Sequence, residues 1–221
     1  TQQTIRTRPA RLFKTYCKNA IQGSCMTDIN SIIEAWVEKS SRVLDLGCGD
    51  GQVLESLIAS HQVHGYGLEI NSESINHCIS RGLNVIEQDL NEGLGNFADN
   101  SFDSVLMTQT LQTLRFPHLA LDEMLRIGRQ CIVTFPNFGH WCTRGDLGFR
   151  GRMPVTKQLV YQWYDTPNIH FFTYKDFEVL CAERNINVVN RVFIGGITND
   201  FGLDAIWPNL FAHTAVYNLS K

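Results

Sequence analysis

The chain has 221 residues with a formal net charge of −3, and 43% of its residues are hydrophobic. A chain of this length can bury a core without disulfides or structural metal ions, and one domain is the expected organisation. The negative net charge argues against nucleic acid or an anionic membrane surface as a partner, because both would repel the protein. The apolar runs all fall short of 18 residues, so no membrane-spanning helix is predicted.

The first 26 residues differ from the rest of the chain, because they carry five basic side chains and no acidic one. We predict that residues 1–26 form a basic extension and that residues 27–221 form a single domain. The extension lacks the apolar core of a signal peptide. The seven cysteines of the chain form no CxxC pair, a pattern typical of reduced thiols. Together these features predict a cytoplasmic protein.

From Thr27 onward, helix-period segments alternate with short apolar runs. Apolar residues at 29, 32, 33, 36 and 37 lie on one face of a first helix. Strands are predicted at 43–46, 63–70, 83–89, 101–108 and 130–136, with helices at 52–60, 72–81 and 118–127 between them. Residues 137–172 are rich in glycine and aromatic residues without a clear period, which predicts an insertion, and a helix at 173–185 and strands at 186–194 and 213–220 follow. This alternation predicts an α/β domain with a mostly parallel sheet and helices on both faces.

The stretch "DLGCGDG", residues 45–51, joins the first predicted strand to its helix. Its glycines have the spacing G-x-G-x-G, and Gln52 stands where the dinucleotide-binding fingerprint requires a third glycine. Asp50 lies where a helix N-terminus would otherwise favour a phosphate. A carboxylate there repels a pyrophosphate and suits a ligand with positive charge. S-adenosylmethionine (SAM) fits this description, because it has a sulfonium, an ammonium and no phosphate.

Acidic residues end the first three predicted strands, where open α/β sheets bind ligands. Glu69 can accept hydrogen bonds from both ribose hydroxyls, a role that would suit NAD equally well. Asp89 can accept a hydrogen bond from the adenine amine, with Leu90 beside the ring. Asp45 is placed to orient the glycine loop or to meet the methionine ammonium through water. An ordinary capping role is the alternative for Asp89.

This combination resembles the class I SAM-dependent methyltransferase superfamily. The resemblance implies a Rossmann-like fold with a seven-stranded, mostly parallel sheet, an antiparallel last strand and, here, an insertion after strand 5. It also implies SAM or S-adenosylhomocysteine (SAH) as the ligand. The matched cofactor-binding positions are Asp45, Gly47, Gly49, Gly51, Glu69, Asp89, Leu90 and Gln109.

Methyl transfer itself receives little support from the sequence, because no general base is evident. Many small-molecule methyltransferases have a histidine close to the end of the fourth strand, where this chain has Gln109 and Gln112. An Asn-Pro-Pro-aromatic motif for methylating base amino groups is also missing, which further disfavours nucleic acid. Candidates in the insertion are His140, Tyr164, Asp165 and His170. Catalytic residues therefore stay unassigned, and no metal site is predicted.

A narrower resemblance rests on "DLGCGDG", "GYGLEI", "DLNEGL", "FPNFGHW", "GRMPVTK" and "WYDTPNIH", which occur in this order. Together they look like the methionine-biosynthesis protein MetW family. That resemblance implies a SAM- or SAH-binding partner that supports the activity of a homoserine O-acyltransferase. The alternative is a catalytically active methyltransferase acting on a small molecule or a protein. Aromatic and arginine residues in the insertion suit a binding surface, which favours the first reading.

Overall fold

The structure, a computed structural model, describes residues 25–156, 159–195 and 206–221. Nearly all of the predicted basic extension lies outside these residues. The first described element is α2 (Cys25–Trp36), whose apolar stripe buries Ile29 and Ile33 against the sheet. Among the described residues, no helix has the length and apolar character needed to cross a membrane.

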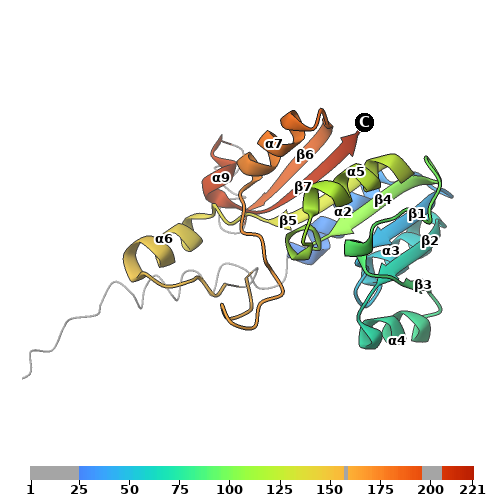
Figure 1. Cartoon of the computed structure of the whole chain (residues 1–221), viewed down its shortest axis with the longest axis horizontal. Helices are drawn as coiled ribbons and strands as arrows, with labels where there is room; N and C mark the ends of the chain where they lie inside the picture. Colours follow the sequence, from blue (N-terminus) through green and yellow to red (C-terminus); the bar gives the residue numbers. More distant parts are fainter. Residues whose placement is uncertain (1–24, 157–158, 196–205) are drawn as a thin grey trace, which may run out of the picture.

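Seven strands form one sheet in the order β3-β2-β1-β4-β5-β7-β6 (Figure 1). Their bounds are β1 (Arg42–Leu46), β2 (His64–Glu69), β3 (Asn84–Glu87), β4 (Phe102–Thr108), β5 (Gly128–Pro136), β6 (Asn187–Gly195) and β7 (Ala212–Ser220). Pairings among β1 to β5 are parallel, whereas β7 runs antiparallel to both β5 and β6. The predicted seven-stranded, mostly parallel sheet with an antiparallel last strand is therefore confirmed.

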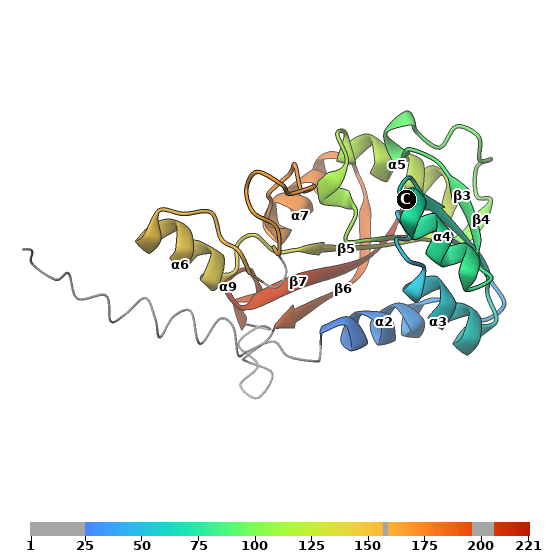
Figure 2. The ribbon, with the colours of Figure 1, turned by 90° about the horizontal axis from the view of Figure 1, so that it is seen from below.

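Helices cover both faces of the sheet, as predicted (Figure 2). The bounds of the main helices are α3 (Gln52–His61), α4 (Ser72–Ser80), α5 (Pro117–Ile127) and α7 (Tyr174–Glu183). Successive residues of β1 point to opposite faces: Val43 packs in the cluster that includes α2 and α3, and Leu44 in the cluster that includes α5 and α7. This alternation is the strand period of two, and it produces two apolar cores, one on each side of the sheet.

The connection between β3 and β4 contains no α-helix, only the short 3-10 helix η1 (Leu90–Glu92). The face of β2 and β3 beside it is consequently open, and Tyr66 and Ile86 are about two-fifths exposed there. A second 3-10 helix, η2 (Leu111–Thr113), follows β4. Asn91 Oδ1 accepts a hydrogen bond from Arg115 N at 2.8 Å, which joins the segments around η1 and η2.

The insertion after β5 contains a helix that the sequence pattern did not predict. This helix, α6 (Trp141–Arg150), includes Gly145 and Gly148, which lower its helix propensity. It begins where the His140 side chain accepts a hydrogen bond from Cys142 N. It projects beyond the end of the sheet in both views (Figures 1 and 2). A short helix, α9 (Pro208–Phe211), precedes β7.

Candidate functional site

The backbone of the glycine loop requires glycine at three positions. Gly47, Gly49 and Gly51 have φ angles of 73°, 56° and 79°, in the left-handed region that other residues rarely adopt. A Cβ on Gly47 would lie 2.6 Å from the Thr110 side chain, and one on Gly51 would lie 2.4 Å from Leu83. Apart from its chain neighbours, no described atom lies within 4 Å of a Cβ placed on Gly49. The loop is therefore packed at its two outer glycines and open at the middle one.

Glu69, the last residue of β2, fixes this loop. Its Oε2 accepts a hydrogen bond from Gly49 N at 2.8 Å. Its Oε1 accepts from Ile70 N at 2.8 Å and from Asn71 N at 2.9 Å. A carboxylate has about four acceptor positions, so one remains for a ligand hydroxyl. Sequence reasoning assigned Glu69 to a ribose and missed its hold on the loop, because a contact between residues 49 and 69 has no local sequence signal.

Asp45 is the most unusual ionisable group of the site. It lies in β1 with 1% of its surface exposed, and its Oδ1 has no hydrogen-bond partner in the described part of the chain. Burial, and secondarily the charge of Glu69, raise the pKa of Asp45 to about 7. A buried polar atom without a partner is costly and is most easily explained by function. The loop thus contains an acceptor position suited to a cationic or hydrogen-bond-donating ligand.

Asp89 and Leu90 follow β3. Asp89 Oδ1 accepts from Asn91 N at 2.9 Å and from Asn91 Nδ2 at 2.8 Å, so the residue caps η1. Leu90 is partly buried against the core that includes α5. Capping occupies one carboxylate oxygen of Asp89, and an adenine amine could use the other. Asp89 therefore has the capping role that was the alternative, and this role is compatible with ligand binding.

Gln109 and Gln112 shape the loop after β4. Gln109 has a positive φ of 55°, and its backbone N donates to Thr134 Oγ1 at 3.1 Å. Gln112 Nε2 donates to Gln109 O at 2.6 Å. The backbone O of Gln112 accepts from Ile169 N at 3.0 Å and from His170 N at 3.1 Å. Gln112 therefore connects the loop after β4 to the insertion, a role that sequence reasoning did not identify.

The eight predicted cofactor-binding residues come together at one edge of the sheet. They lie at or just after the carboxyl ends of β1, β2, β3 and β4, which are consecutive neighbours in the sheet. Their ligand role stays a prediction. Among the described residues, no group of His, Cys, Asp and Glu is arranged to hold a metal ion.

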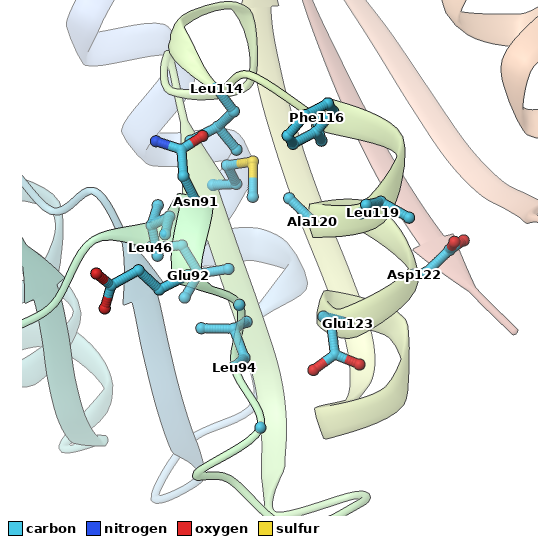
Figure 3. A pocket seen from close by; sticks show the side chains of 14 residues that line it. Leu46, Asn91, Glu92, Leu94, Leu114, Phe116, Leu119, Ala120, Asp122 and Glu123 are labelled. Carbon is cyan, nitrogen blue, oxygen red and sulfur yellow. The ribbon is translucent and has the colours of Figure 1, made fainter.

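A cavity of about 550 Å³ lies on the α5 side of the sheet (Figure 3). Its floor is Leu46 and Met107, and Figure 3 shows residues 91–94 on one side and α5 on the other. Leu90 is common to this cavity and to the predicted ligand site. The sequence analysis did not predict this cavity, which is lined in part by the segment between β3 and β4, where no α-helix forms.

The four candidate bases have different surroundings. His140 caps α6, and burial, followed by the neighbouring His213, lowers its pKa to about 4. Tyr164 and Asp165 are exposed on the insertion. His170 contacts Gln112 through its backbone, and its buried Nε2 has no hydrogen-bond partner among the residues described. Only His170 is thus joined directly to the loop after β4.

Structural comparison finds this fold in known methyltransferases. A SAM dependent methyltransferase from Archaeoglobus fulgidus superposes with a TM-score of 0.64 at 16% identity, covering 96% of this chain and all of that one (100%). A chain from the complex between the Haloferax volcanii Trm112 methyltransferase activator and the putative methyltransferase gives a TM-score of 0.63 at 16% identity, covering 94% and 95% of the two chains. At these identities the similarity shows the fold alone.

Sequence comparison identifies the family. The bifunctional methionine biosynthesis protein MetXA/MetW of Rhodopirellula baltica is 37% identical over 175 residues, and the match covers 75% of this chain. The chain thus spans 28% of the length of that relative. The family model for methionine biosynthesis protein MetW matches residues 27–219. With its glycine loop, its sheet order and this match, the chain belongs to the MetW family of methionine biosynthesis proteins.

Proposed function

We propose that this chain binds SAM or SAH and supports the activity of a homoserine O-acyltransferase as its protein partner. The observation that carries the ligand part is the buried, unpartnered Oδ1 of Asp45 inside a glycine loop held open at Gly49. The partner part is supported by the relative that joins MetXA and MetW in one bifunctional protein.

The residues of the loop fit SAM. Asp45 supplies negative charge for the methionine ammonium, and the remaining acceptor position of Glu69 suits a ribose hydroxyl. Open space at Gly49 allows the ligand to approach the backbone closely. Asp89 and Leu90 would meet the adenine, and Gln109 would close the site from β4. When bound, SAM supplies an electrophilic methyl group, whereas the residues named here bind and orient it.

A sensing role explains the site better than methyl transfer does. The pKa of His140 is lowered to about 4, which makes it a weak base at physiological pH, and its side chain caps α6. Tyr164 and Asp165 lie in solvent on the insertion. Because SAM is a product of methionine metabolism, its binding would let the acyltransferase respond to the output of its own biosynthetic route. The site requires only a ligand-dependent change in shape for this purpose.

A second candidate function, catalytic methyl transfer to a small molecule or a protein, is favoured by one observation. His170 Nε2 and Gln112 Oε1 are both buried without hydrogen-bond partners in the described residues, and the two residues are joined by a backbone hydrogen bond. A methyl acceptor bound beside them would meet a base in His170.

The test is homoserine acylation by the cognate acyltransferase, with and without this chain, and with SAM, SAH or neither. We expect this chain to raise the acylation rate and SAM to change that rate. Asp45→Asn should abolish the SAM effect while leaving stimulation, and Asp99→Asn, an exposed aspartate paired with Arg126, is the control. Lack of stimulation by the wild-type chain would contradict the partner role. Label passing from methyl-labelled SAM to a cell metabolite or protein would support the second candidate instead.

A further inference from the structure

The insertion between β5 and α7 exposes aromatic side chains that proteins normally bury. We call α6 together with residues 151–156 and 159–171 the arm. Phe149 is 90% exposed, Trp163 73% and Tyr164 70%. Further apolar side chains of the arm are also exposed, among them Leu147, Met153 and Val160. Several large exposed apolar side chains in one segment are typical of an interaction site.

The arm is held in place from within and from its base. Leu159 and Asn168 are buried, and the rings of Phe138 and Phe171 pack 4.8 Å apart between their centroids. Arg144 Nε donates to Gly139 O at 2.6 Å, which fixes the start of α6 to the end of β5. The exposed aromatics are therefore carried by a packed segment. A preordered surface loses less entropy when it binds, so its contacts contribute more to affinity.

The charge of the arm narrows the choice of partner. Its described residues include three arginines and two aspartates, although the whole chain has a net charge of −3. Arg150 pairs with Asp146 at 2.6 Å, whereas Arg152 is exposed. A two-fold contact between copies would set the same patch against itself and bring the arginines together. A different protein with apolar pockets and an acidic rim fits better, since aromatic residues and arginine dominate interface hot spots.

The arm also has a direct connection to the ligand site. Its inner end is the segment whose Ile169 N and His170 N donate to Gln112 O, in the loop after β4. Gln112 therefore lies between the inner end of the arm and the predicted ligand contact Gln109. A partner whose affinity depends on the ligand needs a surface that is connected to the ligand site, and the arm has this connection.

We propose that homoserine O-acyltransferase docks on the arm, with Phe149, Trp163 and Tyr164 entering apolar pockets of that enzyme and Arg152 facing acidic groups at their rim. The inference rests on the proposed partnership and specifies its surface. Because these aromatics are between 70% and 90% exposed, replacing them should leave the folding of the chain itself intact.

The experiment measures binding of the full-length chain to the purified cognate acyltransferase by calorimetry. We expect Phe149→Ala and Trp163→Ala each to weaken binding at least tenfold, with the thermal midpoint and the SAM affinity of the chain unchanged. Phe116→Ala is the matched control, because Phe116 is an aromatic residue 55% exposed at the edge of the α5 cavity. It should bind as tightly as the wild type.

The outcomes separate the surface from the partnership. If the wild-type chain does not bind the acyltransferase at all, the proposed function fails. If it binds and the arm variants bind equally well, or if Phe116→Ala alone weakens binding, the partnership stands and the arm is not its surface. Sedimentation that shows a dimer lost on Phe149→Ala, with acyltransferase binding unaltered, would assign the arm to a second copy. The wild-type chain could instead bind phosphatidylglycerol vesicles through the arm. Vesicle binding that is lost in the same variants, while acyltransferase binding persists, would show that the arm contacts a membrane and would equally overturn the proposal.

Discussion

At the scale of single residues, the negative charge of Asp45 lowers the stability of the folded chain, although the proposed binding of SAM requires it. Its carboxyl group has a pKa of about 7 in the folded chain and about 3.8 when unperturbed. Between these values the folded state holds a proton that the unfolded state has released. The free energy of unfolding contributed by Asp45 therefore falls as pH rises from about 4 to about 7, and stays low above that.

Asp45→Asn should accordingly stabilise the ligand-free chain at pH 8 and weaken SAM binding. The gain relative to wild type should approach about 4 kcal/mol at pH 8 and be small near pH 4, from the roughly 1.4 kcal/mol that each pKa unit represents. Urea unfolding of both proteins at several pH values measures it. Two stability curves that run parallel across this pH range would show that Asp45 does not titrate in this way.

A comparison of two glycines with similar backbone conformations distinguishes an effect on ligand binding from an effect of backbone strain. Gly49 and Gly82 have φ angles of 56° and 74°, and a Cβ on either would meet no described atom within 4 Å beyond its chain neighbours. Alanine at either position should cost roughly 1–2 kcal/mol of stability, because the left-handed conformation is strained for it. Only Gly49→Ala should also weaken SAM binding, by tenfold or more in calorimetry, since Gly49 lies in the ligand loop. Equal SAM affinity in the two variants would place the ligand elsewhere.

At the scale of elements, the sequence pattern predicted the strands and helices that pack in the core and missed helices that lie outside it. Strands β1, β2, β4 and β5 and helices α3, α5 and α7 each bury apolar side chains in the two cores, so their hydrophobic pattern is visible in the sequence. Helix α6 projects from the sheet and contains Gly145 and Gly148, which lower its helix propensity, and the sequence analysis did not predict it. The 3-10 helices η1 and η2 are too short to show a period at all.

The same distinction applies to the candidate site. Glycine spacing and acidic strand ends are local features, and they predicted the residues that line one edge of the sheet. The hydrogen bonds from Gly49 N to Glu69 and from the insertion to Gln112 join segments that are 20 or more residues apart. Such contacts follow from the order of the strands and from the path of the insertion. They become visible only in three dimensions.

At the scale of the whole molecule, Gln112 joins the loop after β4, which contains Gln109, to the arm. Its side chain donates to Gln109 O, and its backbone O accepts from the inner end of the arm at residues 169 and 170. The side chain thus ties the backbone that contacts the arm to Gln109 in the same loop. If SAM changes the affinity for the acyltransferase by some factor, thermodynamic linkage requires the acyltransferase to change SAM affinity by the same factor.

Gln112→Ala should reduce this coupling without removing either binding event, because the backbone contacts to the arm persist while the side-chain contact to Gln109 is lost. The measurement is the Kd for SAM with and without saturating acyltransferase. The ratio of the two values should differ from one in the wild type and move toward one in the variant. The matched control is Gln130→Ala, which should keep the wild-type ratio. Gln130 lies near the amino ends of β4 and β5, and its side chain accepts a hydrogen bond from Ser104 Oγ. A ratio unchanged by Gln112→Ala would mean that the ligand site and the arm communicate by another route, and that the side chain of Gln112 serves packing alone.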